Sequence, residues 1–163
     1  MSVDFEHPAN AGLIAYFAAR PGWLLSDEPL SRDPATLPQP YLNLGTHPDI
    51  VERLWDQITV LLPEPCRWVV YHRPVLVHPW NGVVFAFAQG VPTYALRLPE
   101  KERAEAIAAG AKTAITYTAG NRRTRTLDLK AIGEGWVLGS WSEQEARWCL
   151  AAYDCAASEG RPG

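Results

Sequence analysis

The chain has 163 residues, of which 47% are hydrophobic and 20% charged. These values are typical of a folded globular domain and exclude a largely disordered chain. The formal net charge is −3, and residues 1–60 carry most of the excess acid, with eight carboxylates against three arginines. A mildly acidic chain has no long-range attraction for nucleic acids or anionic membranes, so we expect neither as a partner.

The sequence also indicates a compartment. No run approaches the ~20 apolar residues that a membrane-spanning helix needs, and residues 1–10 carry acids where a secretory signal needs bases. Cys66, Cys149 and Cys155 match no disulfide framework and no zinc-binding spacing. We therefore predict a single cytoplasmic domain over residues 1–163, with reduced thiols, no cofactor and no metal.

The first quarter of the chain is rich in proline. Residues 1–10 are predicted to be a mobile lead-in, as are residues 158–163 at the other end. Residues 10–20 have the spacing of a short helix. Residues 23–45 show no periodicity, yet their Trp and Leu side chains are too apolar for a free linker, so we predict an arm packed on the core.

Two amphipathic patterns predict helices that cover a sheet. Residues 47–62 place apolar side chains at helical spacing, after Thr46 as the expected N-cap. The members of this stripe are Val51, Leu54, Trp55, Ile58 and Leu62. Residues 142–157 open with Ser142 and Glu145 at the spacing of a capping box.

A third pattern, over residues 100–110, predicts a polar surface helix. Its acidic first turn suits the positive end of the helix dipole, and Gly110 is the expected stop. We expect only Ala104, Ile107 and Ala108 to face inward.

Residues 67–98 are predicted to form a meander of three antiparallel strands. Asn81 and Gly82 suit the positive φ of a tight hairpin turn, and we expect Trp80 and Val83 to face each other across it. Residues 83–88 are apolar on both faces, which indicates a central strand, with Val83, Phe85 and Phe87 sharing one face.

Further strands are predicted at residues 113–118, 124–129 and 136–138. The expected fold class is α+β. It has an antiparallel sheet of about five or six strands built on the 67–98 meander, with helices 47–62 and 142–157 packed on it.

Four polar residues around the first strand of the meander are candidates for a pocket or ligand site: Tyr71, His72, Arg73 and His78. On one unbroken strand the two histidines would lie roughly 20 Å apart, too far to share a metal ion. A structural or surface role is the ordinary explanation for each histidine, and the alternative is that His72 acts as an acid–base group in a pocket, for which histidine has a suitable pKa. No nucleophile elbow, phosphate-binding loop or dinucleotide-binding motif occurs, so the sequence leaves open whether the protein is an enzyme.

Four other residues are candidates for an interface. Trp80, at the predicted turn, is either tucked under the 23–45 arm or displayed as a binding anchor. Arg122, Arg123 and Arg125 cluster at a second turn. These arginines either bind an oxyanion or an acidic partner, or are simply solvated.

The leading functional hypothesis is a non-enzymatic cytoplasmic protein-binding domain of the adaptor or toxin-neutralising type. One alternative is a small enzyme or small-ligand-binding domain with its pocket between the sheet and the 23–45 arm. Another is an oligomeric structural module. A concave pocket of ~300 Å³ or more that contains His72 or His78 would favour the ligand-binding hypothesis. A flat, exposed apolar patch centred on Trp80 would favour the protein-binding hypothesis.

Overall fold

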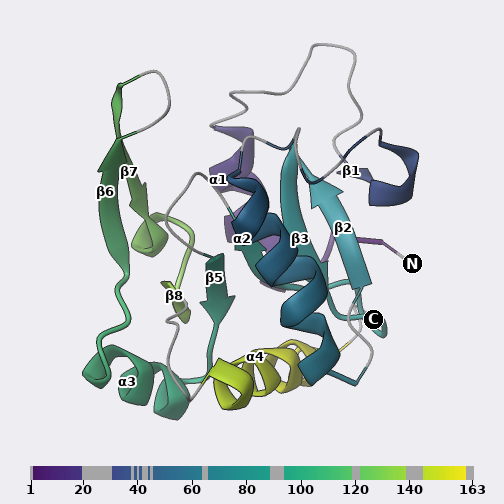
Figure 1. The fold of residues 1–163 in the computed structure, drawn as a ribbon. Coiled ribbons are helices and arrows are strands. Elements are labelled where there is room, and N and C mark those ends of the chain that lie inside the picture. Colours follow the sequence, from purple (N-terminus) through teal and green to yellow (C-terminus); the bar gives the residue numbers. More distant parts are fainter. Residues whose placement is uncertain are drawn as a thin grey trace.

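The structure is a computed structural model, and the part of the chain that it describes forms an α+β fold (Figure 1). The described residues are 2–19, 31–37, 39, 41, 44, 46–63, 66–88, 94–118, 122–138 and 145–160, without the side chains of Cys66 and Arg125. They contain a six-stranded antiparallel sheet, a separate two-stranded sheet and helices packed on both faces of the larger sheet.

The main sheet has the strand order β1-β2-β3-β4-β5-β8, and each neighbouring pair is antiparallel. Its strands are β1 (Ser31–Arg32), β2 (Cys66–Val70), β3 (Arg73–Val77), β4 (Val84–Ala88), β5 (Tyr94–Arg97) and β8 (Trp136–Leu138). The second sheet consists of β6 (Ala114–Thr118) and β7 (Thr124–Asp128). The predicted fold class, with its sheet built on the 67–98 meander, is confirmed.

The helical elements include four α-helices among the described residues. These are α1 (Ala11–Ala18), α2 (Pro48–Glu52), α3 (Glu100–Ala108) and α4 (Glu145–Ser158). A π-helical turn, η3 (Arg53–Gln57), continues α2, and short 3-10 turns lie at η1 (Pro8–Asn10), η2 (Pro34–Thr36), η4 (Thr59–Leu61) and η5 (Leu129–Ala131). The predicted helix 47–62 is thus a continuous run of α-helical, π-helical and 3-10 turns, α2, η3 and η4, which we call the rod.

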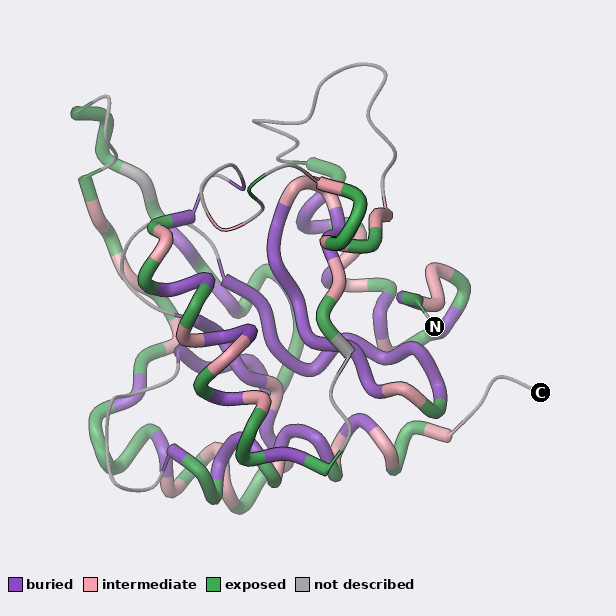
Figure 2. Tube along the Cα trace, turned by 45° about the vertical axis from the view of Figure 1, so that its right-hand side comes forward, coloured by how far each residue is buried: buried purple, intermediate pink, exposed green. Residues whose placement is uncertain are grey.

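Alternate residues of the strands supply two buried layers, one on each face of the main sheet (Figure 2). On one face pack α4 and the rod α2–η3–η4, whose predicted apolar stripe from Val51 to Leu62 is buried. On the other face pack α1 and the β6–β7 hairpin, through residues such as Phe17 and Leu127. Because β4 is buried on both faces, its predicted central position is confirmed.

Residues 2–10, where the sequence predicts a mobile lead-in, pack against the sheet. The buried Asn10 side chain donates to the carbonyl oxygens of Asp4 (2.7 Å) and Gly82 (2.9 Å), and its Oδ1 accepts from the Val84 N–H (2.9 Å). An amide side chain with both donors and an acceptor paired in this way ties the N-terminal segment to the start of β4. Local sequence patterns do not reveal such long-range contacts.

The meander contains four strands, β2 to β5, where the sequence predicted three. Residues 67–79 do not form one strand, because the chain reverses at Tyr71 and His72, with Val70 paired to Arg73. Both turn residues have positive φ (48° and 63°), the conformation of the hairpin turn that matches strand twist. The Arg73 guanidinium donates to the Tyr71 carbonyl (3.0 Å) and lies over the Phe17 ring, 4.6 Å from its centroid. These two contacts stabilise a turn that has no glycine or asparagine in its local sequence.

The second reversal also differs from the prediction. His78 and Val83, not Trp80 and Val83, close it, because the His78 N–H donates to the Val83 carbonyl (2.8 Å). Only Gly82 of the Asn81-Gly82 pair has positive φ, at 72°. The loop is therefore longer than the predicted two-residue turn.

A bulge changes which residues of β4 share a face. Leu76 pairs with Ala86 but Val77 pairs with Val84, so Phe85 is an extra residue on β4. Phe85 and Ala86 consequently both belong to the layer under α4, and Phe87 belongs to the opposite layer. The predicted shared face of Phe85 and Phe87 is wrong.

Smaller differences concern the helix ends. His47, not Thr46, is the N-cap of α2, with its Nδ1 accepting from the Asp49 N–H (3.2 Å). In α3 the buried residue is Ala106, whereas Ile107, predicted to face inward, is 45% exposed. Ser142 lies outside the described residues, as do most of residues 23–45. Within that segment, β1 pairs with β2, Leu44 is buried, and Leu37 and Tyr41 pack against the layer under α2.

Candidate functional site

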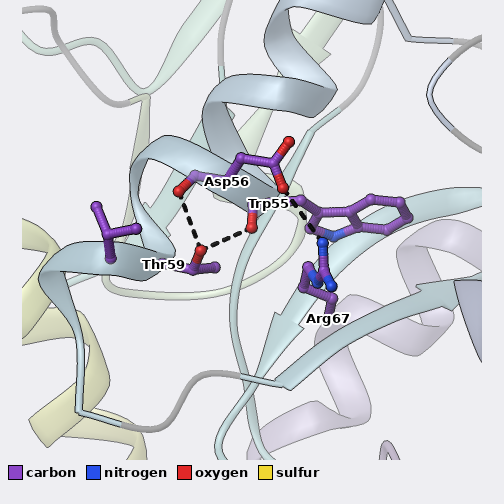
Figure 3. Close-up of a pocket in the computed structure, with 5 residues that line it drawn as sticks. Trp55, Asp56, Thr59 and Arg67 are labelled. Carbon is purple, nitrogen blue, oxygen red and sulfur yellow. Dashed lines mark hydrogen bonds and ion pairs between the residues drawn. The ribbon is translucent and has the colours of Figure 1, made fainter.

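An open depression of about 460 Å³ lies between the helical rod and strand β2 (Figure 3). It is lined by Trp55, Asp56, Thr59, Val60 and Arg67. We call it the η3–η4 depression, because four of these residues belong to that part of the rod and Arg67 reaches it from β2. Val60, which lines the depression, is 78% exposed, and Leu61, the next residue of η4, is 45% exposed; we call these two residues the rim.

The polar groups of the depression are paired with one another. Arg67 Nη1 donates to Asp56 Oδ1 (3.2 Å), and the Tyr41 hydroxyl donates to the same oxygen (2.7 Å). The Thr59 hydroxyl donates to the Trp55 carbonyl (2.7 Å), and the Trp55 indole N–H donates to the Val75 carbonyl (3.0 Å). The depression is consequently a preorganised surface with few uncommitted donors.

The pKa of Tyr41 is raised, first by burial and then by its hydrogen bond to the Asp56 carboxylate and the charge of that group, while Arg67 opposes the shift. The phenol therefore stays protonated and remains a donor to Asp56 at neutral pH. The Tyr41 ring also packs edge-on against Trp55, with centroids 5.6 Å apart. Tyr41 thus supports the depression from the side of the 23–45 segment.

The π-turn η3 directs two of its charged side chains to different elements, Asp56 to β2 and Arg53 to α4. In it the Ile58 N–H donates to the Arg53 carbonyl (2.9 Å), five residues back, so the turn holds one more residue than an α-helical turn. Trp55 is directed into the core, Asp56 pairs with Arg67, and Arg53 reaches Glu145 at the start of α4. Single π-turns inside helices are frequent at functional sites.

A second polar cluster lies buried between the rod, β5 and α4. The Arg53 guanidinium makes a two-pronged ion pair with the buried Glu145 carboxylate, with its Nε 3.0 Å from Oε1. Tyr94 and Cys149, both fully buried, adjoin this pair. The cluster brings a carboxylate, a phenol and a thiol together in the core.

Burial keeps the Cys149 thiol and the Tyr94 phenol of this cluster in their neutral forms. It raises the pKa of Cys149 to about 12, with the Glu145 charge adding to the shift and both Tyr94 and Arg53 opposing it. Burial also raises the pKa of Tyr94, and the charges of Cys149 and Glu145 add to that shift. A thiol that is protonated at neutral pH is a poor nucleophile, so this cluster is structural in character.

Comparisons with protein-family models, curated proteins and solved structures find no match to this chain. Among the described residues, no three His, Cys, Asp or Glu side chains gather as a metal site would require. Nor does any helix in the described part of the chain have the length and apolarity to cross a membrane.

The four residues predicted as a pocket do not converge. Tyr71, His72 and Arg73 lie at one end of β3, and His78 follows its other end. Tyr71 and His72 are half-buried in the hairpin turn, whereas Arg73 and His78 are buried. None of the four lines the η3–η4 depression.

His78 is held in a neutral form by its surroundings. Its Nδ1 accepts from the Trp80 N–H (3.1 Å), and its ring lies against Tyr153, with centroids 4.4 Å apart. Burial lowers the pKa of His78 from its ordinary value of 6.5, and the nearby Asp154 charge opposes the shift. Protonation of this ring therefore works against the folded state.

The pH dependence of stability tests this assignment. Because the folded pKa of His78 lies below 6.5, the contribution of the neutral ring is complete above about pH 6.5 and is lost as pH falls below it. A His78→Asn variant keeps an acceptor for the Trp80 N–H but does not titrate. We expect the free energy of unfolding, measured with urea from about pH 7.5 to about pH 5.5, to fall more steeply for the wild type than for H78N. Parallel pH profiles would contradict the assignment.

The predicted interface residues do not form one surface. Trp80 is 49% exposed in the 79–82 loop, which Asn81 ties to the C-terminal half of α4 through the Ala156 carbonyl (2.7 Å). Arg122 and Arg123 are exposed and directly precede β7, and the β6–β7 hairpin lies away from α4 (Figure 1). The side chain of Arg125 lies outside the described part of the structure.

Sequence reasoning missed the residues of the η3–η4 depression. Asp56 and Arg67 are ordinary charged residues whose pairing depends on how the rod crosses β2. One signal was present, however. Val60 and Leu61 are apolar but fall off the buried stripe of their helix, and such residues must be either covered by another element or exposed.

Proposed function

We propose that this protein is a non-enzymatic, cytoplasmic protein-binding domain that docks a partner on the η3–η4 depression. The observation that carries the proposal is the pair of exposed neighbours at its rim, Val60 at 78% and Leu61 at 45%. Arg67 also lines the depression, and the Tyr41 hydroxyl donates a hydrogen bond to Asp56. Arginine and aromatic residues are enriched in interface cores, and the two exposed aliphatic side chains add apolar surface next to them.

The shape of the depression favours a polypeptide over an enclosed ligand. Small-ligand pockets bury about 70% or more of their ligand, and this depression is open along one side. A partner side chain seated on Thr59 and Val60 would leave the rest of the partner free to cover Leu61. The expected occupant is therefore a protein segment that presents an apolar side chain.

The chemistry of the described residues also favours binding over catalysis. Asp56 and Arg67 neutralise each other, and the Cys149 thiol is buried with a pKa of about 12. His78 is packed against Tyr153 and lies outside the depression. Free thiols at Cys149 and Cys155 fit a reducing cytoplasm.

A charge placed on the rim tests the proposal. We expect Leu61→Asp to reduce capture of a specific partner from source-cell extract at least tenfold, because the partner would have to desolvate a carboxylate. Ile107→Asp is a matched control, since Leu61 and Ile107 are both 45% exposed and Ile107 lies on α3. The readout is quantitative mass spectrometry of the proteins and small molecules retained by each immobilised variant.

Two results would decide the question. A protein retained by the wild type and by I107D, but lost with L61D, supports the docking surface. Identical sets of retained proteins for the wild type and L61D would reject it.

A second candidate function is binding of a small ligand in the same depression. Its volume of about 460 Å³ favours this candidate, because pockets for small ligands start near ~300 Å³. In the same experiment, a small molecule retained by the wild type and lost with Arg67→Met, together with an unchanged protein set, would support the second candidate over the first.

A further inference from the structure

The β6–β7 hairpin stands apart from the main sheet, with β6 at the margin of the molecule (Figure 1). One face of β6 is exposed at Ala114, Thr116 and Thr118, and the other half-buries Ile115 and Tyr117. The β7 strand lies on the side of the main sheet and buries Leu127 completely. The hairpin is thus anchored through β7, and β6 forms its outer strand.

The hydrogen-bond pattern shows which backbone groups β6 turns outward. The Leu129 N–H donates to the Thr113 carbonyl (2.8 Å), so hydrogen-bonded pairs recur at every second position, including Ile115 with Leu127. The remaining pairs are not hydrogen-bonded, which fits the close approach of the Thr116 and Thr126 hydroxyls (3.3 Å). The N–H and C=O groups of Ala114, Thr116 and Thr118 therefore point away from β7.

This outer edge lacks the features that usually protect a strand edge. The sequence Ala-Ile-Thr-Tyr-Thr contains no charge and no proline, and the pairing with β7 runs through five positions without a bulge. Among the described residues, no backbone group bonds to Ala114, Thr116 or Thr118 from the outside. An uncharged, regular edge strand with its hydrogen-bonding groups unused is a template for another strand.

We propose that β6 pairs antiparallel with β6 of a second copy of this chain, in the register that places Thr116 opposite Thr116. Ala114 then faces Thr118 of the partner, and these outward groups form the hydrogen-bonded positions of the new ladder. Ile115 of each copy faces Tyr117 of the other copy at the positions that are not hydrogen-bonded, where side chains approach most closely. Pairs of an aromatic with a β-branched residue are favourable across antiparallel strands.

The strand is complementary to itself, which favours a second copy over an unrelated strand. No charge opposes a like charge at any of its five positions, because β6 carries none. The half-exposed sides of Ile115 and Tyr117 gain cover from their counterparts. A two-fold axis through Thr116 also closes this contact as a dimer, because each copy uses up the outer edge of its own β6.

Cysteine crosslinking tests the register directly. Thr116 of the two copies would lie about 5.5 Å apart between Cα atoms, within the range of a disulfide. Thr118 of one copy faces Ala114 of the other, so two Thr118 residues lie too far apart to bond. We expect the T116C variant to form a disulfide-linked dimer under mild oxidation and the T118C variant to form no such crosslink, with the wild type as the control for the native cysteines.

The mass in solution provides an independent measurement. We expect the wild type to rise with concentration from 18.1 kDa towards twice that mass by light scattering. Thr116→Pro removes an outward N–H but no bond to β7, and should stay at the monomer mass, whereas Thr116→Val should dimerise. Circular dichroism confirms that both variants are folded.

The proposal is overturned if the wild type keeps the monomer mass throughout and T116C crosslinks no more than T118C. It is equally overturned if T116C and T118C crosslink alike, because the register would then be wrong. The β6 dimer and the docking surface at the η3–η4 depression are independent proposals, because L61D should leave the dimer unchanged.

Discussion

Replacing Arg53 with methionine is expected to lower the free energy of unfolding by about 3 kcal/mol, because a buried carboxylate loses its counter-charge. Glu145 is buried at the start of α4, and its two oxygens accept from the Arg53 guanidinium. Methionine fills much of the same volume, so the loss would reflect the uncompensated charge rather than a cavity. Urea unfolding at neutral pH measures it.

Two variants make the Arg53 result specific. The double variant Arg53→Met with Glu145→Met removes both charges and should be more stable than R53M alone, because no unpaired charge remains. Arg147→Met breaks an ion pair with Glu105 that is substantially exposed at both ends, and should cost no more than about 1 kcal/mol. An R53M cost as small as that of R147M would show that the buried pair is not a stabilising link between the rod and α4.

Replacing Asn10 with alanine is expected to destabilise the fold by about 3 kcal/mol. The Val84 N–H would be left buried without its acceptor, and the Gly82 and Asp4 carbonyls would each lose a donor. Because these bonds join residues 2–10 to the beginning of β4, we also expect faster amide exchange in both segments. Urea unfolding and hydrogen exchange give the two measurements.

Thr126→Ala is the control for Asn10→Ala. It removes an exposed hydroxyl from β7 and should change stability by no more than about 0.5 kcal/mol. If N10A unfolds at the same urea concentration as T126A, residues 2–10 are only loosely attached, as the sequence alone suggested.

The parts of the fold that could be predicted depend on short-range periodicity. The buried stripe from Val51 to Leu62 and the doubly apolar run of β4 both follow directly from residue spacing. The reversal at Tyr71 and His72 could not be predicted, because no glycine or asparagine marks the turn and a residue as bulky as Tyr71 is rare at positive φ. It is supported by the contact of Arg73 with Phe17, which is distant in sequence. No feature of the local sequence predicts the bulge at Phe85 either.

The candidate site was harder to predict than the fold. Its polar network joins Tyr41, Asp56 and Arg67, which come from three separate segments and follow no motif. The sequence predicted a pocket at His72 and His78 because histidine can act as an acid, a base or a ligand, yet His78 is buried against Tyr153. Exposure of Val60 and Leu61 is a property of tertiary structure, since it depends on what α4 and β2 leave uncovered.

The connectivity of the main sheet has a consequence for the order of folding. Strands β2 to β5 are joined to their neighbours in sequence order, whereas Arg97 of β5 pairs with Trp136 of β8 across α3 and the whole β6–β7 hairpin. Closing so long a loop costs more conformational entropy than closing a turn, and local contacts form first. We therefore expect the central meander to form first and β8 to complete the sheet late.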